Sequence, residues 1–359
     1  MISRRTLLAL PFAAACSRPQ ESFRGYAFIA NQEGGAIAAV DLGALAVARH
    51  IPLDGAPTEV TAAVRHPSVY ALTPENGSVH EIQIDNLRMS RKLALASQAI
   101  TMALAPGERS LYVLAREPWA LISVAVDSFK VDWKLSLPEE PVGLALAPDG
   151  KTAAVSSAQA VYLVDLDTRR LSAPLGHGDY GPVQFLTDSK TLVAGNRGER
   201  LISTYSVEAK RLITHLPVSV RPDQFCFSRD GGQLFVTGAG MDAVVVVYPF
   251  FTPEVGDTVL AGHAPGAMDV SEDFLFVASP LSGDVSILSI ATRKLIRVVP
   301  VGSDPGFIRV TANDQYALVL NRKSGDVAVL TMKNRYSPVG LLTVIPVGSR
   351  PVSAVVRAV

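Results

Sequence analysis

The segment PVGLALAPDGKTAAVSSAQAVYLVDLDTRRL, from Pro141 to Leu171, decides the fold of this chain. It contains short runs rich in Val, Leu, Ala and Tyr, separated by the turn Pro148-Asp149-Gly150 and by other polar residues. Apolar runs of this length between turn residues are typical of β-strands. No helical apolar period persists along the chain for more than a turn or two, so the sequence predicts an all-β protein.

The same pattern returns throughout the chain. The apolar run that begins at Pro141 has seven counterparts, at intervals of 40 to 46 residues. They begin at Pro57, Ile100, Pro182, Pro222, Pro265, Pro305 and Pro351. A second run, such as LFVTG from Leu234 or ALVLN from Ala317, also occurs eight times. A repeat of about forty residues that holds four strands is the blade of a β-propeller, so the count predicts eight blades.

These rows of strands, together with the I/V-P-V-G ending at Ile345 to Gly348, resemble the YVTN-repeat β-propeller family. The resemblance extends from Tyr26 to Val359 and implies one propeller domain over residues 26–359. The family name alone suggests seven blades, which is the alternative to the count of eight. The resemblance is specific for the fold and says almost nothing about activity.

The repeats are displaced relative to the ends of the chain. The first repeat begins at its second strand, Tyr26 to Asn31, and the chain ends on an unaccompanied first strand, Pro351 to Val359. Left apart, these two segments would form open strand edges. We therefore predict that the C-terminal strand pairs with the N-terminal blade and closes the ring.

Residues 1–16 resemble an export signal, followed by a short linker over residues 17–25. Arg4 and Arg5 precede an apolar stretch from Leu7 to Ala15, which is too short to span a bilayer. SRRTLL resembles the twin-arginine motif, and AAAC ending at Cys16 resembles a lipobox, in which the cysteine is lipidated. Ordinary cleavage near Ala15, by either export route, is the alternative. The sequence thus predicts a periplasmic or surface protein, anchored by lipid at Cys16.

Composition limits the partners and the chemistry. The chain has 33 Lys and Arg against 33 Asp and Glu, so no net charge favours nucleic acid or an anionic membrane, and membrane contact is expected only through a lipid anchor. Besides Cys16 only Cys226 is present, which excludes a disulfide scaffold. Paired Cys/His spacings are absent, and no metal site is predicted.

Candidate site residues lie in the loops that propellers use for binding. His177 and His263 lie in glycine-flanked loops, with Arg221 between them in blade order and Arg350 in a further loop. These four could hold an anionic cofactor such as a haem-type tetrapyrrole, or the histidines could be solvated turn residues. The other histidines are expected away from this rim. A basic collar or a mixed-charge rim could be formed by Arg116, Arg197, Arg221, Arg322 and Arg350.

Three functions are compatible with this reading. The first is a non-catalytic binding or scaffold protein that binds an envelope protein or a small anionic ligand at the channel mouth. The second is a protein that binds or matures a modified haem, because eight-bladed rings occur in the haem-carrying domain of cytochrome cd-type nitrite reductase. The third is a propeller lactonase or lyase, with Glu139, Asp304, Arg350 and His263 as candidates. No catalytic motif such as G-x-S-x-G is present.

Overall fold

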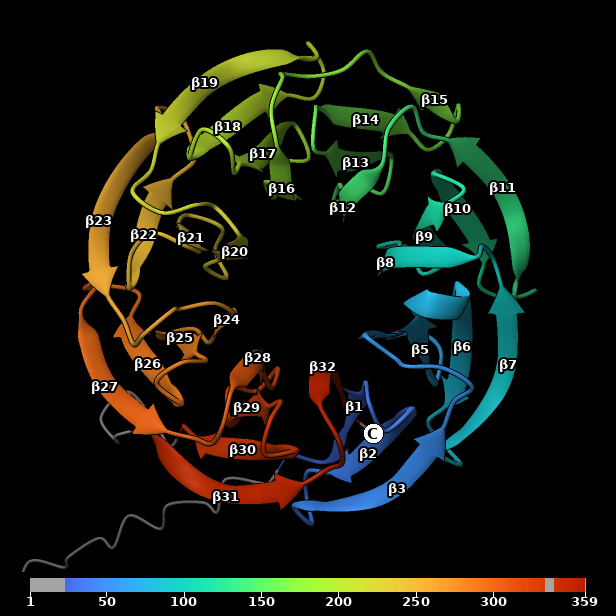
Figure 1. Ribbon diagram of the computed structural model, residues 1–359, viewed down its shortest axis with the longest axis vertical. Helices are drawn as coiled ribbons and strands as arrows, with labels where there is room; N and C mark the ends of the chain where they lie inside the picture. The colour runs from blue at the N-terminus through green and yellow to red at the C-terminus, as the bar shows by residue number, and fades with distance from the viewer. Residues whose placement is uncertain (1–22, 333–338, 359) are drawn as a thin grey trace, which may run out of the picture.

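The computed structural model describes residues 23–332 and 339–358. They form eight four-stranded antiparallel sheets, arranged as the blades of a ring (Figure 1). The predicted eight-bladed β-propeller is confirmed, and the seven-bladed alternative is wrong. We number the blades 1 to 8 from the N-terminus and name the strands of each blade inner, second, third and outer. The predicted export signal and Cys16 lie outside the described residues.

The strands have the following bounds. The inner strands of blades 1 to 8 are β32 (Pro351–Ala358), β4 (Glu59–Ala62), β8 (Gln98–Leu104), β12 (Pro141–Leu146), β16 (Tyr180–Phe185), β20 (Gln224–Phe227), β24 (Met268–Val270) and β28 (Pro305–Val310). The second strands are β1 (Gly25–Asn31), β5 (Ser68–Thr73), β9 (Ser110–Glu117), β13 (Thr152–Ser157), β17 (Thr191–Asn196), β21 (Leu234–Thr237), β25 (Phe274–Ser279) and β29 (Tyr316–Asn321).

The third strands are β2 (Ala36–Asp41), β6 (Ser78–Gln83), β10 (Ala120–Ala125), β14 (Val161–Asp165), β18 (Leu201–Ser206), β22 (Ala243–Tyr248), β26 (Asp284–Ser289) and β30 (Asp326–Thr331). The outer strands are β3 (Ala46–Pro52), β7 (Arg88–Ala94), β11 (Lys130–Ser136), β15 (Arg170–Leu171), β19 (Arg211–Pro217), β23 (Glu254–Leu260), β27 (Leu295–Pro300) and β31 (Gly340–Pro346). A short 3-10 helix, η1 (Pro74–Asn76), lies between β5 and β6.

The ring closes as the repeat offset predicts. β32 pairs antiparallel with β1, in a register that places Tyr26 opposite Arg357 and Ile29 opposite Ala354. The C-terminal strand thus becomes the inner strand of blade 1 (Figure 1). Phe23, just before β1, is also buried, and its backbone N–H donates to Oε1 of Gln315 in blade 8 at 2.6 Å. The first and last described segments therefore both pack at the junction between blades 8 and 1.

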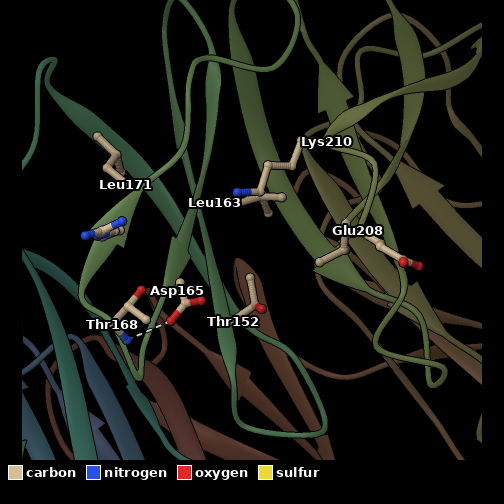
Figure 2. Close-up of a pocket in the computed structure, with 9 residues that line it drawn as sticks. Thr152, Leu163, Asp165, Thr168, Leu171, Glu208 and Lys210 are labelled. Carbon is tan, nitrogen blue, oxygen red and sulfur yellow. Dashed lines mark hydrogen bonds between the residues drawn. The ribbon is translucent and has the colours of Figure 1, made fainter.

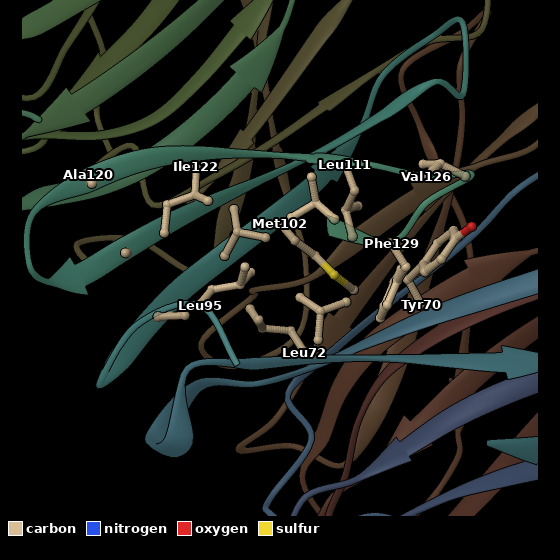
Figure 3. Close-up of a cluster of buried hydrophobic side chains, with 14 of the residues drawn as sticks. Tyr70, Leu72, Leu95, Met102, Leu111, Ala120, Ile122, Val126 and Phe129 are labelled. Carbon is tan, nitrogen blue, oxygen red and sulfur yellow. The ribbon is translucent and has the colours of Figure 1, made fainter. Parts of the chain in front are cut away.

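The core lies between neighbouring blades, because alternate side chains of a strand point to opposite faces of the sheet. Along β1, Ala27 and Ile29 pack toward blade 8, whereas Phe28 and Ala30 pack toward blade 2. Figure 3 shows one such layer, between blades 2 and 3, where the Tyr70 and Phe129 rings stack with centroids 6.2 Å apart. The second and third strands are covered on both faces, which explains their continuous apolar runs.

The ring has two faces that differ in their loops. The upper face holds the loops from each outer strand to the next inner strand and the loops from second to third strands. The lower face holds the turns from inner to second strands and from third to outer strands. Blade 4 departs from the pattern, since its outer strand β15 has two residues where the other seven blades have six or seven. Pro174 follows soon after and supplies no N–H to extend the strand pairing.

Candidate functional site

Asparagines at the ends of second strands hold the loops of the upper face. Asn31 Nδ2 donates to the carbonyl oxygen of Val347 at 2.7 Å, and Asn321 Nδ2 donates to that of Val301 at 3.0 Å. Both side chains are almost fully buried. Each amide donates to a carbonyl oxygen in the loop that enters an inner strand. The asparagine that ends the second-strand run therefore holds the upper loops in position.

An arginine follows this asparagine position in two blades and lies over the inner strand. Arg197 lies against Gly181, where a Cβ would be 2.1 Å from the arginine Nε, and Arg322 lies in the same way against Gly306. A side chain larger than hydrogen at either glycine would displace the guanidinium. The glycines in these inner strands therefore allow the arginines to lie across the upper end of the ring.

Every arginine predicted for a basic collar is paired with a carboxylate. Arg116 contacts Glu140 at 2.9 Å, Arg322 contacts Asp304 at 2.5 Å, and Arg350 contacts Glu33 at 3.3 Å. Asp223 receives both Arg221, at 2.9 Å, and Arg197, at 3.3 Å, from neighbouring blades. Of the two alternatives left open by the sequence, the structure selects the mixed-charge rim.

Acidic residues outnumber basic ones on the upper face. The acidic residues of its loops and adjoining strand ends are Glu33, Asp54, Glu59, Glu75, Glu117, Glu139, Glu140, Asp179, Glu199, Asp223, Asp242, Asp284, Asp304 and Asp326. The basic residues are Arg116, Arg197, Arg200, Arg221, Arg322, Lys323 and Arg350, together with Lys92 and Lys134, which reach this face from outer strands and contact Asp54 and the Leu95 carbonyl oxygen. Because the arginines of the collar are already paired, the remaining field of this face is negative. We call these residues together the upper rim.

His263 is held by an acid of the preceding blade. Its Nδ1 lies 2.7 Å from Oδ2 of Asp242, while Oδ1 of Asp242 accepts the backbone N–H of Ala264 at 2.8 Å. The Ala264 N–H, and then the His263 ring, lower the pKa of Asp242 below its usual value. An Asp hydrogen bond to Nδ1 orients the ring and leaves Nε2 for another partner. This is the geometry of a ligand histidine or of a proton acceptor.

The four predicted cofactor residues do not form a single contact set. His177 is exposed, and within the described residues its side chain makes no hydrogen bond. Arg221 is bound to Asp223, Arg350 to Glu33 and His263 to Asp242. They come from separate loops of the rim, and no hydrogen bond or ion pair joins one to another among the described residues.

The candidates for a lactonase or lyase have structural partners instead. Glu139 accepts hydrogen bonds from the Ser157 hydroxyl and from the Tyr162 hydroxyl, the latter at 2.8 Å. Burial, and then the hydrogen bond to Glu139, raise the pKa of Tyr162 to about 12. Asp304 is bound to Arg322, as described above. These acids join strands and loops within their own blades, and their geometry is that of structural residues.

One histidine expected away from the rim lies at it. His80 is fully buried in β6, and its Nε2 is 3.1 Å from the Thr73 hydroxyl and 3.3 Å from Oδ1 of Asp54 in an upper loop. Burial is the main cause that lowers the pKa of His80. The adjacent polar residues His80 and Glu81, in a row of strands that is apolar in most other blades, are the sequence signal that could have revealed this position.

One cavity lies outside the upper rim. It measures about 480 Å³ and lies between blades 4 and 5, beside the shortened outer strand β15 (Figure 2). Its lining mixes Leu163 and Leu171 with Asp165, Glu208 and Lys210. The described residues contain no group of three or more His, Cys, Asp or Glu side chains suited to a metal ion. Within the described part of the chain, no helix is long and apolar enough to cross a membrane.

Comparisons with known proteins identify the architecture. No protein-family model and no curated protein matches the sequence. Among solved structures, "Dihydro-heme d1 dehydrogenase NirN in complex with DHE" superposes with a TM-score of 0.75 at 13% identity, covering 94% of this chain and 77% of that chain. Hydrazine synthase of Kuenenia stuttgartiensis gives a TM-score of 0.61 at 18% identity, covering 77% and 96%.

A third similar structure is the Cps50 (Swd1) β-propeller domain of Myceliophteria thermophila, with a TM-score of 0.64 at 12% identity, covering 78% of this chain and 98% of that domain. At these identities the likeness shows a shared β-propeller fold, and activity does not follow from it.

Proposed function

We propose that this protein is an exported, lipid-anchored β-propeller of the YVTN-repeat kind that binds a protein with a basic surface on its upper rim. The observation that carries the proposal is the pairing of each collar arginine with a carboxylate, on a face where acids outnumber bases. A small anion would have to displace a carboxylate from a bound guanidinium. A cationic partner meets a complementary field, which raises the rate of association and favours the correct orientation.

Site-specific photocrosslinking in intact cells tests this binding function. A crosslinker at Glu75, which is exposed in η1, is compared with one at Arg211, which is exposed on the outer strand β19. We expect a discrete adduct from Glu75 only, with a protein whose binding weakens as salt rises. Replacement of Glu33 and Glu140 by Gln should reduce it. Equal adducts from both positions, or an adduct that salt does not affect, would contradict the proposal.

Anchoring is tested separately. Mass spectrometry of the protein isolated from bacterial membranes should show an acylated Cys16 at the new N-terminus. A Cys16→Ser chain should be released in soluble form from the envelope. An unmodified mature N-terminus elsewhere would remove the lipid anchor from the proposal and would leave the rim interaction to be tested on its own.

Tetrapyrrole binding is the second candidate function, and one observation favours it. His263 has the orientation of an iron ligand, with Nδ1 bound to Asp242, and the chain superposes on 94% of its length with a protein solved in complex with DHE. The arginines fit less well, because Arg221 and Arg350 are bound to carboxylates and present no free guanidinium to propionates. Titration with haem should give a Soret shift that His263→Ala and His177→Ala abolish. A spectrum unchanged by the protein would remove this candidate.

A further inference from the structure

The lower face carries arginines that differ from those of the upper rim. Arg24 precedes Gly25, which pairs with Ala358, and Arg357 lies opposite Tyr26 in the same strand pair. Arg357 Nη2 donates to the carbonyl oxygen of Val64 at 2.5 Å. These contacts bring the lower ends of blades 1 and 2 together, at the point where the described chain begins.

The same surface continues into blade 3. The backbone N–H groups of Val64 and Arg65 each donate to a carboxylate oxygen of Glu108 at 2.7 Å, and Arg109 follows Glu108. Arg24, Arg65 and Arg109 are exposed, Arg357 is partly exposed, and Val64 between them is 70% exposed. We call these four arginines and Val64 the lower arginine patch.

The arginines of the patch differ from other arginines in their ion pairing within the described part of the chain. Among the described residues, none of its four arginines forms an ion pair with a carboxylate, whereas Arg229 and Arg293 elsewhere on the lower face are bound to Asp314 and Asp257. Glu108 contacts the Arg65 backbone, but its side chain is 8% exposed and both its oxygens accept backbone N–H groups. Asp41, in the neighbouring turn, accepts the N–H groups of Gly43 and Ala44.

The chain leaves the ring beside this patch. Phe23 is buried at the junction of blades 8 and 1, and Arg24 is the next residue. Cys16 precedes Phe23 by seven residues, which span at most about 25 Å when fully extended. In the lipid-anchored protein of the proposed function, the bilayer surface therefore lies within about that distance of the patch.

We propose that the lower arginine patch docks on anionic phospholipid headgroups, so that the ring rests on the bilayer through the lower face of blades 1 to 3. This inference rests on the lipid anchor of the proposed function. Guanidinium groups bind phosphates through paired hydrogen bonds, and each basic residue near an anionic bilayer strengthens binding. Val64 adds an apolar contact at the interface. The upper rim then points away from the membrane, where a partner can reach it.

Vesicle binding by the full chain carrying Cys16→Ser tests the patch without acylation. Phosphatidylcholine vesicles with and without phosphatidylglycerol are compared for the variant R65E/R109E and for the control R211E/R297E. The control changes the net charge equally, at exposed residues of outer strands. We expect a preference for phosphatidylglycerol that the patch variant loses, with binding weakened about fivefold or more for each reversed arginine, while the control keeps it. Equal behaviour of the two variants would overturn the proposal.

A second measurement reads the orientation of the acylated protein on vesicles. Single fluorescent labels at Val64→Cys on the lower face and at Ser349→Cys in an exposed loop of the upper face are quenched by lipids with nitroxide headgroups. Cys226 is buried, and burial raises the pKa of its thiol, so it does not compete for the label. Strong quenching at position 64 and weak quenching at position 349 supports docking; the reverse, or equal quenching, contradicts it. If the native protein carries no acyl group, only the lipid anchor of the proposed function is contradicted. Vesicle binding by the Cys16→Ser chain still tests the lower arginine patch.

Discussion

The upper rim and the lower arginine patch use the same side chain in opposite ways. On the rim, Arg322 and Arg350 reach carboxylates of neighbouring loops, at 2.5 Å and 3.3 Å. On the lower face, the Glu108 carboxylate is occupied by backbone N–H groups, and Arg65 and Arg109 beside it remain without an acidic partner among the described residues. The local charge of a propeller face therefore depends on which groups its acids bind as well as on how many acids it carries.

The largest effect is expected from deleting residues 351–359, which removes Arg357 from the patch and the inner strand from blade 1. The deletion leaves the β1 edge unpaired and exposes the core on both faces of blade 1. We expect the free energy of unfolding to fall by more than about 5 kcal/mol, which is enough to abolish cooperative unfolding. Thermal denaturation and size-exclusion chromatography measure this. Arg357→Gln in the intact chain is the control, and it should melt close to the native protein. A truncated chain with an unchanged melting temperature would contradict ring closure by β32.

Replacing one acid on each face should distinguish an acid that binds backbone N–H groups from an acid that pairs with an arginine. Glu108→Gln replaces one oxygen that accepts a partly buried N–H with an NH₂ group, and we expect a loss of about 1 to 2 kcal/mol in the free energy of unfolding. Glu33→Gln removes a carboxylate that is 62% exposed and pairs with Arg350, and we expect a change within about 0.5 kcal/mol. Urea denaturation of both variants checks the difference. Equal losses would mean that the two acids act alike.

Releasing arginines of the upper rim from their carboxylates should make the rim bind phosphate groups, as proposed for the lower arginine patch. Asp223→Asn releases Arg197 and Arg221 from their shared carboxylate, so we expect about 1 kcal/mol of destabilisation and a gain in affinity for pyrophosphate. Asp179→Asn makes the same charge change on the rim without releasing an arginine, and it serves as the control. Isothermal titration with pyrophosphate compares them. If both variants gained equally, the pairing at Asp223 would not be what keeps anions away.

The smallest effect is a pH dependence at the upper end of blade 2. Glu59 accepts the Met102 N–H at 2.9 Å and the Thr101 hydroxyl at 2.8 Å, and burial, the largest cause, raises the pKa of its carboxyl. A raised pKa in the folded state favours the protonated form, so stability falls as pH rises from the unfolded pKa through the folded pKa. Glu59→Gln should remove this fall, while Glu33→Gln should keep it. Melting temperatures of the native protein and both variants, measured from pH 4 to pH 8, test this. The same pH dependence in all three would contradict the role of Glu59.

Much of the fold could be predicted because the apolar runs and turn residues that specify each strand are local in sequence and recur in every blade. The apolar runs from Leu234 and Ala317 become second strands β21 and β29, and the offset between Tyr26 and Pro351 becomes the pairing of β1 with β32. Blade 4 could not be predicted in full, because its shortened outer strand depends on how Ser172 and Leu175 hydrogen-bond to β14. His80 was placed away from the rim, since its partner Asp54 lies 26 positions earlier, in the loop that enters blade 2.

The number of blades, the order of their strands and the closing strand follow from the amino-acid sequence, because strand period and turn residues act over a few positions. The pairing of acids with arginines follows from the folded ring. Arg350 meets Glu33 across 317 positions of sequence, and Arg229 meets Asp314 across 85. A net charge of zero is an average over the whole chain, and it conceals a negative upper rim and a positive lower patch. Ring closure and blade packing bring such distant charges together, and electrostatic energy depends on those distances.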